Sequence, residues 1–266
     1  MRRRLAVPTV AVLLLIPGAS ARAQTAQPTL SIDSIVAGVR AGIQVFLSSL
    51  PNMVCDETIR SYEVRGKKKV REVQLDSEME VKREDGTQSF KEERILHSLN
   101  GNPMAKGETV QISMPLILQG GFANDFAGSF QPEFVACNEY RVVQGDAETL
   151  TLEVSQKQRL PATAACGQLN PGDVSVFLIE RSSWRIERAE RHGPQTHVGD
   201  FKNLSWITEF ALIPLGDRTY NLPTRVDGTL KVPSGKHQVV YTADYRNYHR
   251  FSATIKILQD NQAPPQ

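Results

Sequence analysis

The number and spacing of the cysteines limit what chemistry they can perform. The three cysteines are Cys55, Cys137 and Cys166, and no pair has the C-x-x-C spacing of a redox or zinc site. An odd number leaves one thiol unpaired. Cys137 and Cys166 flank a predicted hairpin turn at Gln144–Asp146, which keeps them close along the chain. The sequence therefore predicts a Cys137–Cys166 disulfide and a buried, unpaired Cys55.

Histidine and serine motifs for catalysis or metal binding are missing from the sequence. His192 and His197, with Asp200 nearby, come closest to a ligand set, but their spacing around a Gly-Pro loop matches no common zinc site. No G-x-S-x-G or H-E-x-x-H motif occurs. The segment Gly101–Thr109 reverses the Gly-Lys order of a phosphate-binding loop. We predict no metal, no cofactor and no enzyme activity, with a hydrolase of dispersed catalytic residues as an alternative.

Residues 1–23 have the order of a secretory signal. Three arginines, Arg2 to Arg4, precede the apolar run Val10–Ile16 and the small residues around Ala23. The alternative, a membrane anchor, needs an apolar run of roughly 20 residues, and this run is far shorter. We expect cleavage after Ala23, a periplasmic or secreted protein, and no integral membrane span.

Removal of the signal changes the charge balance. It takes away four of the 31 basic residues and none of the 29 acidic ones, so the remaining chain has a formal net charge of −2. The run Arg65–Lys69 lacks interleaved aromatic residues, which favours a solvated hairpin tip over a phosphate-binding patch. We predict no nucleic-acid partner.

Two stretches have helical periodicity. In residues 32–50 apolar side chains recur every three or four positions, and Pro51 prevents continuation. In residues 114–130 the phenylalanines are spaced by four, and Gly120-Gly121 would bend the helix. This second segment is either ordinary cover for the core or a movable lid over an apolar cavity.

Most of the remaining chain alternates apolar and polar residues with the period of a β-strand. Val239, Tyr241, Ala243 and Tyr245 fall on one face, and the alternation resumes at Phe251 after a break at residues 246–249. About eleven strands are predicted, too many for a flat sheet. They are residues 58–65, 69–82, 88–99, 134–143, 150–154, 174–179, 184–189, 204–213, 220–230, 239–245 and 251–257.

These patterns predict one α+β domain over residues 31–258. Its single antiparallel sheet is strongly curved, as an incomplete barrel, and the helices at residues 32–50 and 114–130 cover its concave face. The polar leader, residues 24–30, and the tail, residues 259–266, are expected to be disordered.

The order of elements over residues 31–258 resembles that of the periplasmic lipoprotein carriers and their lipid-binding relatives, the LolA/LppX-like proteins. The hairpin at residues 174–191, with Trp184-Arg185-Ile186, and the segment 245–251 are the local similarities. This resemblance implies a curved, incompletely closed sheet that holds an apolar cavity with helices as its lid.

A curled sheet of this size has more concave area than two modest helices fill, which favours binding of an apolar ligand such as a lipid or lipoprotein acyl chain. Gly120-Gly121 would be the hinge of the lid. The predicted ligand contacts are Met114, Phe122, Phe126, Phe130, Trp184 and Trp206. The alternative is a protein-interaction module of the cell envelope, which would bind its partner through an exposed sheet edge or apolar surface.

Overall fold

The computed structural model divides the chain into two units, Met1–Leu30 and Ser31–Gln266, and the helices and strands described below all belong to the second unit. The described residues are 30–84, 87, 90–105, 128–161, 166, 172–193, 202–231 and 236–251. The predicted signal peptide, most of the predicted helix 114–130, all but the first residue of the predicted strand 251–257, and the tail lie outside them.

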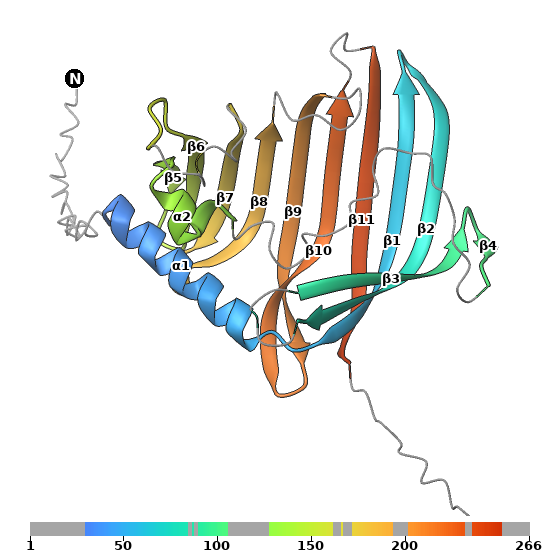
Figure 1. Ribbon diagram of the computed structural model, residues 1–266, viewed down its shortest axis with the longest axis horizontal. Coiled ribbons are helices and arrows are strands. Elements are labelled where there is room, and N and C mark those ends of the chain that lie inside the picture. The colour runs from blue at the N-terminus through green and yellow to red at the C-terminus, as the bar shows by residue number, and fades with distance from the viewer. Residues whose placement is uncertain are drawn as a thin grey trace, which may run out of the picture. The chain divides into compact units, whose positions relative to one another are not determined.

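One antiparallel sheet of eleven strands forms the framework, in the order β4-β3-β2-β1-β11-β10-β9-β8-β7-β6-β5 (Figure 1). Within these strands β4 and β5 form the two ends of the order, so the sheet is an open, curved structure and not a closed barrel, as predicted. The strands are β1 (Met53–Arg65), β2 (Lys68–Arg83), β3 (Phe90–Leu99), β4 (Asn102–Pro103), β5 (Asn138–Gly145), β6 (Thr149–Gln156), β7 (Val174–Glu180), β8 (Arg185–Gly193), β9 (Lys202–Leu215), β10 (Arg218–Lys231) and β11 (His237–Arg250).

Alternation along the strands places one side chain in two on the inner face. In β11 the residues Val239, Tyr241, Ala243 and Tyr245 are all buried, as their spacing predicts. Opposite them, β1 buries Glu57, Ile59 and Ser61 on the same face. The polar alternates face outward, which is the pattern of an antiparallel sheet with one wet side.

Helix α1 (Ile32–Ser49) covers the inner face at the β5–β8 end of the sheet (Figure 1). It begins where Ser31 Oγ accepts a hydrogen bond from the backbone N–H of Ser34 at 3.1 Å. It ends where the N–H of Leu50 donates to the carbonyl of Phe46, just before Pro51. By length and composition α1 could cross a membrane, but its apolar stripe is packed in the core.

Two hydrophobic clusters fill the inner face. The first, which we call the β-cluster, gathers side chains from β1, β2, β9, β10 and β11 around Tyr241. The second, the α1-cluster, packs Ile35, Val39 and Ile43 of α1 against β6, β7 and β8. Phe46 of α1 contacts both clusters, so it lies at the boundary between them.

The predicted disulfide is present. Cys137, next to the short helix α2 (Pro132–Val135), is bonded to Cys166, and their Cα atoms are 5.4 Å apart. Cys55 on β1 is buried and unbridged, as expected.

Three details of the strand assignment were wrong. First, β11 continues through residues 246–249, where a break was predicted, because the ladder with β1 accommodates an irregularity between Val54 and Asp56. Second, the chain from Pro132 to Val135 is helical, so β5 begins only at Asn138. Third, the short β4 lies within residues 100–107, for which the sequence predicts a loop and no strand.

Candidate functional site

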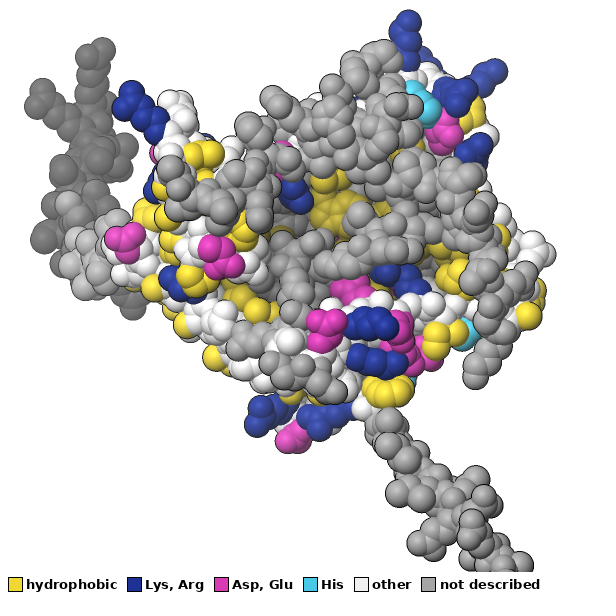
Figure 2. All heavy atoms as spheres, viewed as in Figure 1, with side chains coloured by type: hydrophobic (Ala, Val, Ile, Leu, Met, Phe, Trp, Pro, Cys, Tyr) yellow, Lys and Arg dark blue, Asp and Glu magenta, His cyan; other side chains and the backbone are white. Residues whose placement is uncertain are grey.

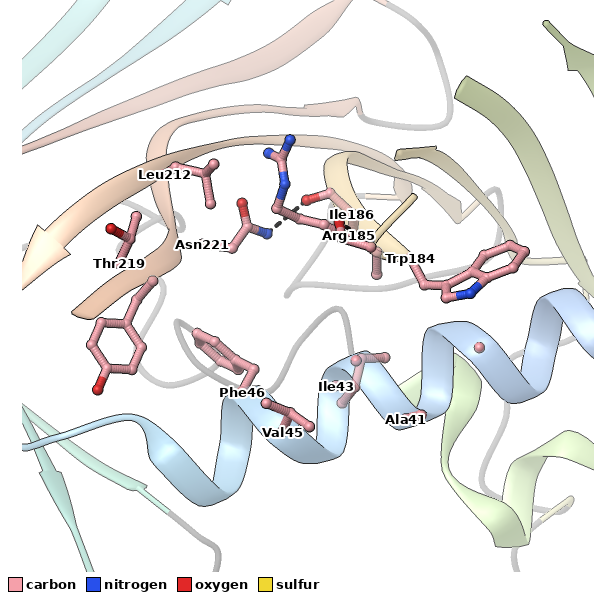
Figure 3. A pocket seen from close by; sticks show the side chains of 14 residues that line it. Ala41, Ile43, Val45, Phe46, Trp184, Arg185, Ile186, Leu212, Thr219 and Asn221 are labelled. Atoms are coloured by element: carbon pink, nitrogen blue, oxygen red, sulfur yellow. Dashed lines mark hydrogen bonds between the residues drawn. The ribbon is translucent and has the colours of Figure 1, made fainter. Parts of the chain in front are cut away.

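Beside β8 the strands of the sheet separate, because β9 stays paired with β10 beyond the point where its pairing with β8 ends. Pairing between β8 and β9 ends at Arg188 and Glu209, whereas β9 and β10 stay paired as far as Leu215 and Arg218. The end of the β9–β10 hairpin therefore leaves the plane of β8. Asn221 on this hairpin donates a hydrogen bond from Nδ2 to the carbonyl of Ile186 at 2.7 Å, which ties the hairpin back to β8 by a side chain (Figure 3).

A groove of about 480 Å³ lies where α1 passes this division. This volume is within the range of small-molecule sites. Figure 3 shows α1 along one side, the β9–β10 hairpin along the other, and Phe46 pointing between them. The lining residues are Gly38, Ala41, Gly42, Ile43, Val45 and Phe46 of α1, Ser183 to Ile186 of the β7–β8 turn and β8, and Leu212 and Thr219 to Asn221 of the hairpin.

Small residues on α1 shape the groove. Gly38 and Gly42 are one helical turn apart, so they share a face with each other. The β7–β8 turn approaches this face, and a Cβ atom on Gly38 would lie 2.6 Å from the Trp184 ring. Trp184 has a φ of 59°, a left-handed conformation that bulky residues rarely adopt. Side chains larger than hydrogen at Gly38 would displace this indole.

Apolar side chains remain exposed at the rim of the groove. Val45 is 67% exposed on α1 and Leu212 is 54% exposed on β9, and both line the groove. Two such residues on opposite walls leave apolar surface that an apolar ligand would remove from water.

Among the described residues that line the groove, Arg185 alone has a charged side chain, and its charge is compensated. Arg185 forms an ion pair with Glu187 at 2.8 Å and lies 3.8 Å from a carboxylate oxygen of Glu180. Ser182 and Ser183 also donate to Glu180, and these hydroxyl bonds lower the pKa of that carboxyl. Because Arg185 already faces two carboxylates, it is not a strong site for a third anion.

The six predicted ligand contacts do not form one described site. Trp184 lines the groove, whereas Trp206 stacks on Tyr241 in the β-cluster with ring centroids 5.3 Å apart. Phe130 is a core residue, 2% exposed and packed edge-on against Phe177. Met114, Phe122 and Phe126 lie outside the described residues.

The inner face also contains a buried ion pair that the sequence did not reveal. Arg94 of β3 donates two hydrogen bonds to the Glu57 carboxylate, from Nε at 2.7 Å and from Nη2 at 3.0 Å. Ser77 donates a third at 2.9 Å. Burial disfavours the charge of Arg94, but the hydrogen bonds and charge of Glu57 outweigh it and raise the pKa of Arg94 further.

Two tyrosines lie beside this ion pair. Burial and the nearby charge of Glu57 raise the pKa of Tyr241, and burial also raises that of Tyr245. Neither phenol ionises in the physiological range. The inner face is thus not purely apolar, and it holds a neutralised charge pair among phenols.

One serine, one histidine and one glutamate come within hydrogen-bond reach on the outer face. Ser205 Oγ is 3.4 Å from His192 Nδ1, and His192 Nε2 is 3.3 Å from a Glu190 oxygen. Ser205 and His192 are direct neighbours across β8 and β9, and all three are solvent-accessible. Glu190 is shared with Arg188 at 3.0 Å. This set is outside the groove, and the part of the chain that the structure describes does not enclose it as expected of a triad.

Among the described residues, no group of three or more His, Cys, Asp or Glu side chains could hold a metal ion.

Three solved structures are similar to this chain over most of its length. The chain is similar to a LolA superfamily protein from Nitrosomonas europaea, with 12% identity, coverage of 85% of this chain and 96% of the other, and a TM-score of 0.33. A DUF1329 family protein from Desulfovibrio piger matches with 10% identity, coverage of 84% and 95%, and a TM-score of 0.38. A putative outer membrane lipoprotein-sorting protein domain from Vibrio parahaemolyticus matches with 10% identity, coverage of 82% and 93%, and a TM-score of 0.41.

No protein-family model and no curated protein sequence matches the chain. The class of fold, an open antiparallel sheet with a helix on its inner face, therefore rests on the strand order itself.

The residues of the groove were missed by sequence reasoning, except for Trp184. One signal was available: the pair Gly38 and Gly42, one turn apart on an otherwise regular helix, marks a close approach of another segment. The division of the sheet beside β8 has no such signal, because it depends on how far two strands stay paired.

Proposed function

We propose that the protein binds an apolar chain, such as the acyl chain of a lipid or lipoprotein, and performs no chemistry on it. The observation that supports this is the groove between α1 and the β9–β10 hairpin, with apolar residues on both walls. Each methylene that such a chain buries would contribute about 0.8 kcal/mol before the cost of ordering it. Several buried methylenes give useful affinity without a charged anchor.

The predicted lid belongs to the same proposal. Met114, Phe122 and Phe126, with Gly120-Gly121 as hinge, would extend the apolar contact beyond the described groove. An exported, periplasmic location would bring the protein to such ligands, and the sequence order of residues 1–23 supports it.

A titration of delipidated protein with a fluorescent fatty acid tests the proposal. Ala41 lines the groove, so Ala41→Phe should fill part of it and weaken binding about tenfold or more. Ala37→Phe is the matched control, because Ala37 is exposed one turn earlier on α1 and does not line the groove. It adds the same side chain to the same helix and should leave affinity unchanged.

The lid is tested by Phe126→Asp in the same titration, together with native mass spectrometry of protein purified from its own envelope. Weaker binding in this variant and a co-purifying lipid are expected. Absence of saturable binding would reject the lipid proposal.

The second candidate is a protein-interaction module of the envelope. The observation that favours it is the exposure of Val45 and Leu212, which a partner could cover. Lipid-free protein that binds no fatty acid, and whose groove residues become protected in a complex, would support this candidate over the first.

A further inference from the structure

A cluster of basic side chains lies where the tips of two neighbouring hairpins meet at one end of the sheet. The β1–β2 turn and the β10–β11 connection meet there, because Arg65 pairs with His237 and the N–H of Gly66 donates to the carbonyl of Lys236 at 2.8 Å. Figure 2 shows dark blue side chains gathered in this region. The basic members, all exposed, are Arg65, Lys67, Lys68, Lys69, Arg71, Lys231 and Lys236.

Acidic side chains compensate only part of this charge. Glu63 pairs with Arg65 at 2.9 Å and with His237, and Glu72 pairs with Lys69 at 2.5 Å. Seven basic residues thus face two acidic ones in the described part of the cluster. The sequence alone shows only the run at residues 65–69. The fold adds Lys231 and Lys236 from a segment far away in the chain.

An exposed valine lies within the cluster. In the β1–β2 ladder, Glu63 lies opposite Arg71 and Val64 lies opposite Lys69. Val70 has no residue opposite it and is the extra residue of a β-bulge. Its side chain is 50% exposed between two basic residues. A β-bulge interrupts the alternation of side chains between the two faces of the sheet. Here it leaves the apolar side chain of Val70 exposed among the basic residues of the β1–β2 hairpin tip.

The positive charge of the cluster and the exposed Val70 side chain together suit binding to a membrane surface. Anionic headgroups attract Lys and Arg, and an apolar side chain among them can enter the boundary between headgroups and acyl chains. A nucleic acid would be expected to use aromatic side chains for stacking. The Tyr62 ring, three residues before Arg65 on β1, is already covered by the Lys69 ammonium at 4.7 Å.

From this geometry we infer that the tips of β1–β2 and β10–β11 dock the protein on membranes rich in anionic phospholipids. This surface is distinct from the groove, so it does not depend on ligand binding there. Without residues 1–23 the chain as a whole has a slight negative charge, so the positive charge is concentrated at this end of the sheet. The protein would approach an anionic surface with this end first.

Co-sedimentation with vesicles tests the docking. The purified protein should bind vesicles of phosphatidylcholine with phosphatidylglycerol at low salt, bind pure phosphatidylcholine far less, and dissociate as salt is raised. Each basic residue near such a surface contributes about a fivefold gain in partitioning, so the double variant K67E/K68E should lose at least about twentyfold. Both side chains are exposed at a turn, so the fold should not change.

Two control variants separate the causes. R141E/R159E reverses two exposed charges elsewhere on the molecule and should bind as the unchanged protein does. Val70→Ser should weaken vesicle binding but leave binding to a heparin column unchanged, because heparin has no apolar interior.

Equal binding to neutral and anionic vesicles, or equal loss in both double variants, would overturn the inference. Affinity for a short single-stranded oligonucleotide equal to that for anionic vesicles, and lost in K67E/K68E, would assign the cluster to polyanions in general and would also overturn it.

Discussion

The indole of Trp184 packs directly on Gly38 of α1, and a Cβ atom added to Gly38 would lie 2.6 Å from two ring carbons. One helical turn further, the nearest neighbours of a Cβ on Gly42 would be backbone atoms of Ser183 and Trp184, the closest at 3.5 Å. The two glycines therefore have different roles. Gly38 makes room for a ring, while Gly42 lines the groove without a close neighbour.

Substitution of each glycine by alanine should distinguish these roles. Both variants gain about 1 kcal/mol from the better helix propensity of alanine. G38A also forces the indole to move, and overpacking of this kind costs about 1–3 kcal/mol. We expect G38A to be less stable than G42A by that amount in urea unfolding. Equal stability of the two variants would contradict the packing described for Trp184.

A double substitution identifies the indole as the cause. Adding Gly38→Ala to a Trp184→Ala protein should cost nothing, since the clashing ring is gone. A persistent cost would place the strain elsewhere in α1.

The curved sheet could be predicted because its strands repeat one simple rule. Alternation in β11 assigns Tyr241 and Tyr245 to the inner face, and both are buried. The same rule holds for Leu75, Met79 and Val81 of β2. The alternation within one strand identifies both the strand and its buried face, so these can be predicted without knowing which strands lie beside it.

The predicted break in β11 was wrong for a physical reason. Residues 246–249 have the composition of a turn, and Asn247 does take a left-handed conformation with a φ of 53°. The strand nevertheless continues, because the neighbouring ladder with β1 bulges there. Asn247 Nδ2 also donates to Asp56 Oδ2 across the ladder at 2.6 Å. A local turn signal and a bulge look alike until the partner strand is known.

The groove was beyond sequence reasoning for a related reason. It depends on the β8–β9 ladder ending at Glu209 while the β9–β10 ladder continues. Pairing length is a property of two strands together. The phenylalanine pattern drew attention to Phe130 instead, and that side chain is part of the packed core.

The cysteines should differ sharply in reactivity. Cys55 is fully buried, and burial together with the charge of Glu57 raises the pKa of its thiol. Alkylation of the native, unreduced protein should therefore leave Cys55 unmodified and detect a linked Cys137–Cys166 peptide by mass spectrometry. Because its folded pKa is raised, the contribution of Cys55 to stability is present below the unfolded pKa of about 8.5 and is lost above it.

Loss of the disulfide should lower stability substantially. The cysteines are separated by 29 residues, for which the chain-entropy estimate is about 3–4 kcal/mol. The double variant C137A/C166A should unfold at lower urea by that amount. A reducing agent should shift the unchanged protein in the same way and have no effect on the variant.

Acid should weaken a hydrogen-bonded carboxylate between β2 and β3. Ser98 donates to Asp76 at 2.6 Å and Thr58 donates at 3.1 Å, and these bonds lower the pKa of Asp76. A lowered pKa gives stability that is present above the unfolded value of about 4 and is lost as pH falls through the folded value. Ser98→Ala should cost about 1–2 kcal/mol at neutral pH and progressively less as the pH falls below the unfolded value of about 4. Ser48→Ala, whose hydroxyl bonds only a carbonyl, should show no such pH dependence.

The ion pair of the inner face should be far more sensitive to substitution than a surface pair. The Glu57 side chain is fully buried and Arg94 is 14% exposed, whereas in the Arg141–Glu153 pair the arginine is 68% exposed. In both pairs the arginine donates from Nε and Nη2, but Arg94 reaches both oxygens of Glu57 and Arg141 reaches only one oxygen of Glu153, so the buried pair also has the stronger hydrogen-bond geometry. Arg94→Met leaves the carboxylate buried without its charge partner and should cost about 3–5 kcal/mol.

The matched surface variant Arg141→Met should cost less than about 1 kcal/mol in the same urea titration, because water screens the charge that remains. Adding Glu57→Leu to the Arg94→Met protein should then recover part of the loss, since no buried charge is left over. Equal costs for the two single variants would mean that solvent reaches Glu57. A double variant no better than Arg94→Met would mean that packing of the long arginine stem, and not its charge, stabilises this part of the sheet.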